Sequence, residues 1–204
     1  AGTVVFSGLR EAAAAAAALA APPSPPLPAP PAIAPLLPAL GGPLSEAETR
    51  DMLQANGIAL PPARLVTAPE GLPAAAAELG YPLAMKAQSR ALPHKTEAGG
   101  VALGLRDAAG LQAAWARIHA AVAAHAPDAP LQGVLLTPMA GDGVEMIIGG
   151  LFDPVFGAMV SVGAGGTATE LYQDVAWRLA PLDATAAAAM LRELRCFPLL
   201  DGYR

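Results

Sequence analysis

The densest group of chemically capable side chains lies in Pro93–Val101, which reads Pro-His-Lys-Thr-Glu-Ala-Gly-Gly-Val. An imidazole, an ammonium and a carboxylate stand here within a few positions of a glycine pair. A second ammonium, that of Lys86, lies just upstream inside the apolar segment Leu83–Ala87. Positive side chains and glycine amides are groups that bind phosphate in proteins. The two segments together therefore predict a phosphate-handling site.

Lys86 interrupts a segment that is otherwise apolar and that we expect to form a strand over 81–88. A charged group buried there without a partner would cost several kcal/mol, so the ammonium must reach water, a carboxylate or a bound anion. We favour a bound phosphate, because Lys95 and the glycine pair follow so closely. The alternative is a lysine on an edge strand whose charged head reaches solvent.

The loop after this strand contributes His94, Lys95, Gly99 and Gly100. Glycine lets backbone amides approach an anion closely and adopts positive φ, so the pair predicts a flap over phosphate groups. The neutral imidazole of His94 is a nucleophile that could accept a phosphoryl group. Its alternatives are a hydrogen bond to a phosphate and a simple place in a turn. The loop is neither a P-loop nor a dinucleotide fingerprint, because it lacks the glycine spacing of both.

Three acidic residues in the second half are further candidates. Glu145 stands in an apolar strand, where its carboxylate is suited either to sugar hydroxyls or to an ion pair. Glu170 and Asp174 are separated by one helical turn, the spacing that places two carboxylates side by side near a cation. A solvated helix face is the alternative for that pair. We therefore expect Glu170 and Asp174 to be metal ligands.

The composition narrows the class of protein. Apolar residues make up 54% of the 204 residues, and the net charge of −5 argues against a non-specific nucleic-acid binder. No apolar stretch is long enough for a membrane span, because the alanine run 12–21 is stopped by Pro22-Pro23. The single cysteine, Cys196, cannot form an internal disulfide and fits a reducing compartment. We therefore expect a cytoplasmic protein without nucleic-acid or membrane partners.

Proline content divides the chain into three parts. Residues 1–21 are expected to form a short strand and an alanine-rich helix, as the tail of a preceding domain. Residues 22–43 are rich in proline and form a linker, because proline supports neither a helix interior nor a central strand. This linker is either a passive spacer or a tether that carries a domain between two stations. Residues 44–204 form the folded domain.

The folded domain mixes helix and strand signals in an irregular order, which does not fit a doubly wound parallel sheet. We expect an α+β protein of two lobes around a cleft, with a small lobe over about 60–128 and a hinge within 131–143. Helices are expected to begin at the capping residues Ser45, Thr67, Asp107 and Asp183. Strands are expected over 65–67, 81–88, 101–105, 131–139, 144–151 and 155–162.

These motifs, taken in order, resemble a known family. Lys86 and Pro93–Val101 are followed by a series of short motifs, namely Gly143-Val144-Glu145, Asp153-Pro154-Val155-Phe156-Gly157, Gly163-Ala164-Gly165-Gly166, Arg178-Leu179-Ala180-Pro181-Leu182 and Pro198-Leu199-Leu200-Asp201-Gly202-Tyr203-Arg204. The order resembles the ATP-grasp domain of the NDP-forming acyl-CoA synthetases, which include ADP-forming acetate–CoA ligases and feruloyl-CoA synthetase-like enzymes. The resemblance covers about residues 44–204 and implies the ATP-grasp fold, with a nucleotide cleft between its lobes.

The resemblance implies a phosphohistidine relay. The family converts a carboxylic acid, CoA and ATP to acyl-CoA, ADP and phosphate, reversibly, and passes the phosphoryl group through histidines. His94 matches the phosphoryl acceptor of this domain, and Lys86 matches the lysine that grips the nucleotide phosphates, with Lys95 beside it. Gly99 and Gly100 match the flexible loop over these phosphates. Phosphoryl transfer depends on charge neutralisation and alignment, which these residue types can supply.

The same resemblance implies the remaining nucleotide contacts. Glu145 matches the ribose-binding acid, and backbone groups of Thr137 and Met139 would face the adenine, where many relatives carry an acid. The implied cofactors are ATP or ADP with Mg2+, and CoA bound in a ligase region outside this chain. The implied partners are CoA-binding and ligase domains of the same or a partner chain, in a homo- or hetero-oligomer.

Two departures from the family matter. The chain ends before the family's terminal strand, whose D-x-N-P motif supplies magnesium ligands. It also lacks the CoA-binding and ligase regions, since residues 1–21 resemble only the end of the ligase region. We therefore expect a C-terminally truncated fragment that is inactive by itself. The alternatives are the ATP-grasp-like regulatory part of a GNAT-linked protein lysine acetyltransferase and a non-catalytic nucleotide-binding module.

Overall fold

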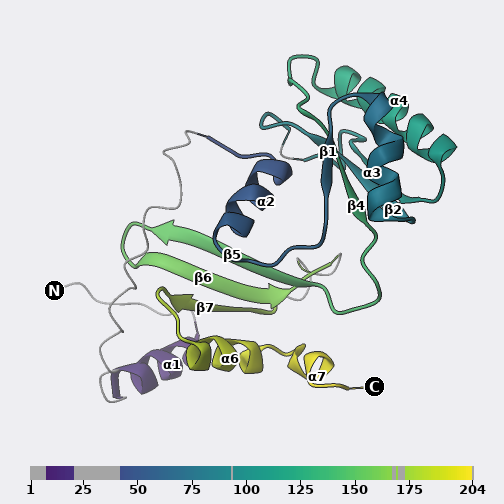
Figure 1. Ribbon diagram of the computed structural model, residues 1–204. Coiled ribbons are helices and arrows are strands. Elements are labelled where there is room, and N and C mark those ends of the chain that lie inside the picture. Colours follow the sequence, from purple (N-terminus) through teal and green to yellow (C-terminus); the bar gives the residue numbers. More distant parts are fainter. Residues whose placement is uncertain (1–7, 21–41, 93, 167–168, 170–172, 204) are drawn as a thin grey trace. The chain divides into compact units, whose positions relative to one another are not determined.

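The computed structural model describes residues 8–20, 42–92, 94–166, 169 and 173–203. The chain divides into two compact units, one over residues 33–143 and the other over residues 144–204 together with the segment 1–32. Figure 1 shows the elements of both units, which are described one at a time. No helix in the described ranges is both long and apolar enough to cross a bilayer.

The unit 33–143 is built on a four-stranded antiparallel sheet in the order β1-β4-β2-β3. Its strands are β1 (Arg64–Val66), β2 (Leu83–Gln88), β3 (Val101–Leu105) and β4 (Gly133–Pro138). All four were expected from the sequence within two residues at each end, and β2 pairs with β3. The central place of β2 matters for the site, because this strand carries Lys86.

Two helices pack against this sheet, α3 (Leu72–Leu79) and α4 (Ala108–His125). They also contact each other, and Figure 1 shows them side by side next to the strands. Helix α4 turns a stripe of apolar residues at helical spacing toward the sheet. The resulting core consists of large aliphatic side chains that solvent hardly reaches, among them Leu72, Leu83, Met85, Leu111, Ile118, Val122, Val134 and Leu136.

The capping predictions in this unit have different outcomes. Helix α2 (Glu46–Ala55) begins with the predicted capping box at Ser45, and Asp107 caps α4. The prediction that Thr67 caps a helix is wrong. The chain first makes a short 3-10 turn, η1 (Pro69–Gly71), and then enters α3 without a side-chain cap. Prolines occupy the first turn of both elements and lack the N–H groups that a cap would satisfy.

The unit that includes residues 144–204 has a three-stranded antiparallel sheet in the order β5-β6-β7. Its strands are β5 (Met146–Asp153), β6 (Gly157–Ala164) and β7 (Val175–Leu179). The turn between β5 and β6 follows Asp153, whose carboxylate accepts hydrogen bonds from two following backbone N–H groups. The sequence analysis missed β7, where apolar residues alternate with Ala176 and Arg178 at the period of a strand.

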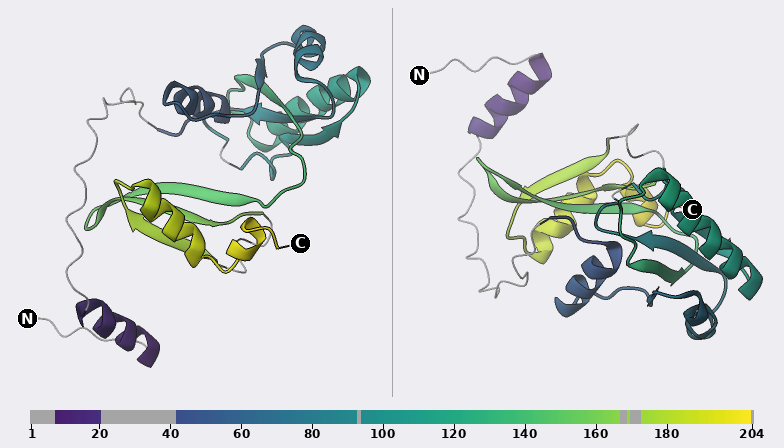
Figure 2. Two further views of the ribbon diagram at one scale, coloured as in Figure 1. Left: turned by 60° about the horizontal axis from the view of Figure 1, so that its bottom comes forward. Right: turned by 90° about the horizontal axis from the view of Figure 1, so that it is seen from above.

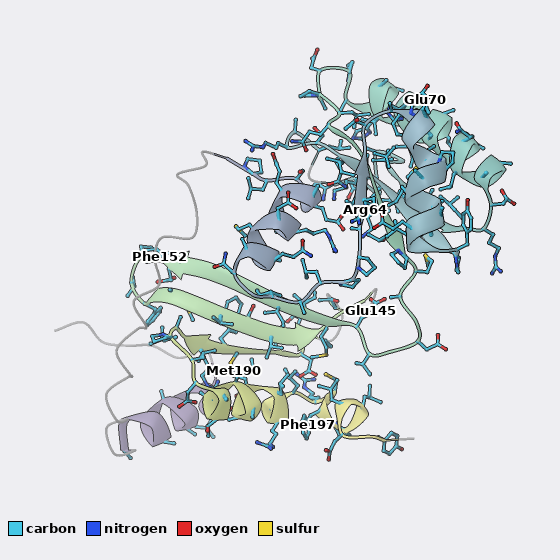
Figure 3. The ribbon with its side chains drawn as sticks, in the orientation of Figure 1. Arg64, Glu70, Glu145, Phe152, Met190 and Phe197 are labelled. Carbon is cyan, nitrogen blue, oxygen red and sulfur yellow. The ribbon has the colours of Figure 1, made fainter. Side chains whose placement is uncertain are left out.

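Helix α6 (Ala184–Glu193) covers one face of this sheet, as Figure 2 shows, and begins at the predicted cap Asp183. A short helix, α7 (Phe197–Leu200), follows it and was not predicted. Figure 3 labels Met190 on α6 and Phe197 on α7, and Phe197 packs against the buried cluster that includes Met190. The buried core between sheet and helix is small and consists of Val162, Ala176, Met190 and Leu194.

The remaining expectations concern boundaries. Helix α1 (Leu9–Ala20) was predicted, whereas the strand expected before it and most of the linker 22–43 lie outside the described residues. The first unit extends to residue 143 and includes α2, so it is larger than the small lobe expected over about 60–128. The physical reason is strand β4, which pairs with both β1 and β2 and completes their sheet.

Candidate functional site

Lys86 lies near the end of β2, one of the two inner strands of the sheet. The alternative of an edge-strand lysine is therefore wrong, because β2 pairs with β4 and β3. All residues of β2 except Lys86 are buried, and Lys86 keeps partial access to solvent. The strand thus holds the base of this side chain firmly and leaves its charged end at the surface of the sheet.

The ammonium of Lys86 meets a carboxylate that the sequence analysis had not singled out. Lys86 Nζ lies 2.9 Å from Glu46 Oε1, and Lys95 Nζ lies 2.9 Å from Glu46 Oε2. Each oxygen of one carboxylate therefore binds a different ammonium. These are the only two lysines of the sequence, so a single acidic side chain brings together both lysines of the chain.

The electrostatic state of Glu46 follows from two opposing effects. Partial burial raises the pKa of this carboxyl, but the hydrogen bonds and charges of Lys95 and Lys86 outweigh it and hold the pKa below its ordinary value. The carboxylate is thus charged at neutral pH, and the three groups together carry one net positive charge. Their side chains are about 20–30% exposed, which leaves room for an incoming anion.

His94 lies at the start of a compact turn and is exposed. The backbone of this turn is internally bonded, because Gly99 N–H donates to the carbonyl of Thr96 and Gly100 N–H donates to that of Lys95 over 2.7 Å. The carbonyl of Gly100 in turn accepts the N–H of Ala87 in β2. The turn therefore fixes Lys95 next to the strand that carries the other lysine.

The two glycines permit close packing in this turn. A Cβ at Gly100 would come within 2.9 Å of the Lys95 carbonyl oxygen, and Gly99 has φ +66° with Ala121 of α4 against it. Both amide groups already donate within the turn, which differs from the predicted flap with amides over phosphate groups. In this conformation the glycines shape the loop instead of offering donors to an anion.

Three of the predicted residues, Lys86, His94 and Lys95, line one pocket of about 460 Å³. It brings together both lysines, the imidazole and two carboxylates on an otherwise polar surface of the unit 33–143. Its charged and polar groups come from the first turn of α2 and, about forty positions further along the chain, from β2 and the loop that joins it to β3. The lining residues are Glu46, Lys86, His94, Lys95, Thr96, Glu97 and Val101.

Helix α2 is anchored at the end that carries Glu46. Gln88, which is fully buried in β2, accepts the N–H of Ala47 through its side-chain oxygen over 2.9 Å. Glu48 closes the capping box by accepting the N–H of Ser45, and it also binds Arg90 and Gln132. These contacts tie the first turn of α2 to β2 and to the segments that follow β2 and precede β4. They fix the position of the intervening Glu46.

The residues predicted to face an adenine lie on or after β4. Thr137 is buried and paired with Ala84 of β2, and Met139 donates its N–H to the carbonyl of Pro82 over 3.0 Å. Strand β1 pairs with β4 only as far as Leu136. From Thr137 onward, β4 therefore has β2 as its neighbour on one side, and its other edge is not covered by β1.

The acidic candidates of the second half belong to the other compact unit. Glu145 is exposed and immediately precedes β5, and Figure 3 shows it at the opposite end of that strand from Phe152. Its carbonyl accepts the N–H of Gly165, and its side chain lies against Gly166. The structure therefore brings Glu145 to the glycine loop that follows β6.

Asp174 does not fit the predicted metal ligand. It lies just before β7 and is buried, and its two oxygens accept the N–H groups of Arg195 and Cys196 at 2.9 and 2.8 Å. Burial raises the pKa of this carboxyl, but these backbone hydrogen bonds bring the pKa below its ordinary value. Glu170 lies outside the described residues. Among the described residues there is no group of three or more His, Cys, Asp or Glu side chains that could hold a metal ion.

A family model described as an ATP-grasp domain matches residues 39–204. The chain therefore belongs to the ATP-grasp domain family, as its motifs had indicated, and the ATP-grasp fold with α+β content is confirmed.

Named relatives place it more narrowly. It is 40% identical to trans-feruloyl-CoA synthase FCS1 of an unknown prokaryotic organism, over 84% of this chain and 24% of that protein. It is 36% identical to the beta subunit of acetate–CoA ligase [ADP-forming] II of Pyrococcus furiosus, over 78% of this chain and 67% of that subunit. The resemblance to ADP-forming acyl-CoA ligases is thus confirmed, and the chain spans about a quarter of the feruloyl relative.

Solved structures agree with this placement. The chain matches dinucleotide forming acetyl-coenzyme A synthetase 1 of Ca. Korarchaeum cryptofilum, in complex with coenzyme A, Ca-AMPCP and HgCl+, with a TM-score of 0.74 and 36% identity over 79% of this chain and 70% of that one. A second structure of that enzyme is a complex with coenzyme A and Mg-AMPPCP, with its phosphohistidine segment pointing towards the nucleotide binding site. It matches with a TM-score of 0.63 and 33% identity over 78% of this chain and 68% of that one.

The residue that sequence reasoning missed is Glu46. Acidic residues are common in the first turn of any helix, where they interact favourably with its dipole, so nothing in the local pattern distinguishes Glu46. The capping box predicts where α2 begins, but it says nothing of which strand the helix contacts. Only the tertiary structure shows that the two lysines, forty or more positions further along, converge on this carboxylate.

Proposed function

We propose that this chain is the nucleotide-binding portion of an ADP-forming acyl-CoA synthetase. The whole enzyme converts a carboxylic acid, CoA and ATP to acyl-CoA, ADP and phosphate, and the reaction is reversible. The role of this portion is to bind ATP or ADP and to exchange a phosphoryl group between the nucleotide and His94. The family membership and the named relatives support this proposal.

One observation carries the proposal: His94, Lys86 and Lys95 line the same pocket. In the transfer from ATP, an imidazole nitrogen of His94 attacks the terminal phosphorus, and the bond between that phosphorus and the bridging oxygen breaks as ADP leaves. The reverse step forms ATP from ADP and phosphohistidine. The two ammonium groups neutralise charge on the transferred phosphoryl oxygens, which is the main requirement of this reaction.

The other predicted contacts are kept within this proposal. The edge of β4 at Thr137 and Met139 is assigned to the adenine, which is consistent with the end of β1 pairing at Leu136. The exposed carboxylate of Glu145 is assigned to the ribose hydroxyls. Mg2+ accompanies the nucleotide, and Asp174 is not assigned to it because both of its carboxylate oxygens accept backbone N–H groups.

The partners and the compartment belong to the same proposal. CoA and the acid are assigned to ligase domains on the same or a partner chain, because two of the relatives are named CoA ligase and CoA synthase. A cytoplasmic location agrees with the single cysteine, which cannot form an internal disulfide.

Nucleotide binding is tested by calorimetry with Mg-ADP and Mg-ATP on the 204-residue chain. Lys86→Met is expected to weaken binding by roughly 10-fold or more, because it removes a charge-assisted contact to the phosphates. Arg106→Met removes a cation outside the pocket and serves as the matched control. Equal affinities of the two variants would contradict the assignment of Lys86.

The phosphoryl transfer is tested on the whole enzyme of which this chain is proposed to be a portion, with ATP that carries a radioactive terminal phosphate. Wild type and His125→Ala are expected to become labelled in an acid-labile, base-stable form, whereas His94→Ala is expected to remain unlabelled. His125 is an exposed histidine at the end of α4 and is the matched control. A wild-type chain that binds nucleotide but stays unlabelled would reject the relay and favour a non-catalytic nucleotide-binding module.

A further inference from the structure

Glu46 is the unexpected member of the lysine pocket. A bridging carboxylate is not required to satisfy the two lysines, because their ammonium groups are partly exposed and water could solvate them. It nevertheless takes one hydrogen bond from each ammonium, at 2.9 Å in both cases. A phosphoryl group would be bound in the same way, with one of its oxygens accepting a hydrogen bond from each ammonium.

The two sides of this contact differ in their freedom to move. Glu46 lies in the first turn of α2, which is fixed by the capping box at Ser45 and by the buried hydrogen bond from Ala47 to Gln88. Each lysine has a flexible four-carbon side chain. A change of partner would therefore move the ammonium groups, while the carboxylate stays in place.

We propose that Glu46 is an internal counter-anion, which holds Lys86 and Lys95 until a phosphoryl group with two or more negative charges takes them over. This proposal rests on the proposed function, since it concerns the same lysines. Glu46 is a specificity-determining residue here, because an incoming anion must compete with a carboxylate already held at both ammoniums. Singly charged anions such as chloride compete poorly, whereas a phosphoryl dianion attracts both ammoniums more strongly than one carboxylate does.

The chain offers an unusually direct way to observe this exchange. With only two lysines in the sequence, selective isotope labelling of lysine gives side-chain NMR signals from Lys86 and Lys95 alone. Inorganic pyrophosphate serves as the probe, at constant ionic strength and in chloride buffer. Titration is expected to shift both lysine signals together in the wild type, because the two ammoniums leave the same carboxylate.

The decisive variants are Glu46→Gln and Glu46→Ala. Each removes the competing charge, so pyrophosphate is expected to bind roughly 5- to 10-fold more tightly than to the wild type. Chloride is also expected to compete more effectively in these variants, which lowers the selectivity for the dianion. A residue that merely supports the fold would not change this selectivity. Circular dichroism confirms that each variant is folded before it is titrated.

Glu97→Gln is the matched control. Glu97 lines the same pocket, and it takes part in none of the ion pairs found among the described residues. Its substitution removes the same charge without touching the lysine contacts, so pyrophosphate affinity is expected to change by less than about 2-fold. Equal effects of Glu97→Gln and Glu46→Gln would overturn the proposal, because charge in the pocket alone would then explain both.

The remaining outcomes are equally clear. Unchanged or weaker pyrophosphate binding by folded Glu46 variants would overturn the proposal, and so would a wild-type chain whose lysine signals do not respond to pyrophosphate. Tighter pyrophosphate binding by these variants, in a chain that binds neither Mg-ADP nor Mg-ATP, would support the role of Glu46 and reject the proposed nucleotide function. The two proposals therefore fail separately.

Discussion

The two compact units of this chain bury their apolar side chains to different extents. In the unit 33–143, two helices and a four-stranded sheet enclose a continuous aliphatic core. In the other unit, one face of a three-stranded sheet meets α6 over a small core, and Phe152 and Val155 are about 80% exposed. The lysine pocket therefore belongs to the better packed of the two units.

The largest effect is expected from a cavity in the first core. Ile118 of α4 is fully buried, so Ile118→Ala should lower the free energy of unfolding of this unit by about 2–5 kcal/mol. The two tryptophans allow the units to be followed separately, since Trp115 lies in one unit and Trp177 in the other. Urea unfolding is followed by fluorescence in two backgrounds. In Trp177→Phe the remaining Trp115 reports the unit 33–143, and in Trp115→Phe the remaining Trp177 reports the other unit. A matching shift of the Trp177 transition would show that the units unfold as one.

The second unit should depend strongly on one buried carboxylate. Asp174→Ala leaves the N–H groups of Arg195 and Cys196 without their acceptor. The free energy of unfolding of the second unit, followed through Trp177, should fall by about 1–3 kcal/mol. Asp174→Asn keeps one acceptor oxygen and should cost less. Asp153→Ala, at an exposed turn of the same sheet, is the control with the smaller loss. A larger loss from Asp153→Ala would refute this account of Asp174.

A smaller, pH-dependent effect is expected at Glu48. Its hydrogen bonds with Arg90, followed by the bond from the backbone of Ser45, lower the pKa of this carboxyl from 4.5 to about 2. A lowered folded-state pKa contributes stability that is present above pH 4.5 and is lost as the pH falls toward 2. Glu48→Gln should therefore lower the melting temperature by a few degrees at pH 7, and this difference should disappear near pH 2.

Thermal unfolding followed through Trp115, at several pH values, measures that prediction. Glu70→Gln changes an exposed glutamate of η1 in the same unit and should have a smaller effect at pH 7. A difference between wild type and Glu48→Gln that persists unchanged at pH 2 would show that the charge of Glu48 is not its cause.

The smallest effect is expected on the exposed apolar surface of the second unit. Phe152→Ser removes a large side chain that is 78% exposed, so the free energy of unfolding should change by no more than about 0.5 kcal/mol. Urea unfolding of the second unit, followed through the fluorescence of Trp177, measures this change in the free energy of unfolding. A loss comparable to that of Asp174→Ala would mean that Phe152 is buried in the protein in solution, and the contrast between the two units would then be weaker.

Much of the fold could be predicted from the sequence because its signals are local. The apolar segment of β2, the caps of α2, α4 and α6 and the turn at Asp153 each depend on neighbouring residues. Strand β7 was missed because the helical spacing of Glu170 and Asp174 was given more weight than the alternation of Val175 and Trp177 around Ala176. The assembly of the sheets depends on contacts between distant segments, for which a single sequence has no local signal.

The candidate site likewise combines residues with a local sequence signal and residues that only contacts between distant segments reveal. Lys86, His94 and Lys95 were found because charged groups stand out in or beside an apolar strand. The predicted flap at Gly99 and Gly100 differs from the observed turn, since their amide groups are used within it. Glu46 was missed because only the anchored position of α2 against β2 makes it a partner of the lysines. Residue type thus predicted the cations, and tertiary structure was needed to find their counter-anion.

The buried amide of Gln88 determines how far this unit can be shortened. Its side-chain oxygen has the N–H of Ala47 as a partner, and its side-chain nitrogen donates to the carbonyls of Lys86 and Ala87. Cleavage by a protease between α2 and β1 would let the helix depart and leave this oxygen buried without a donor. The smallest autonomous piece that still presents the lysine pair must therefore begin before Ser45, even though the sheet itself starts at Arg64.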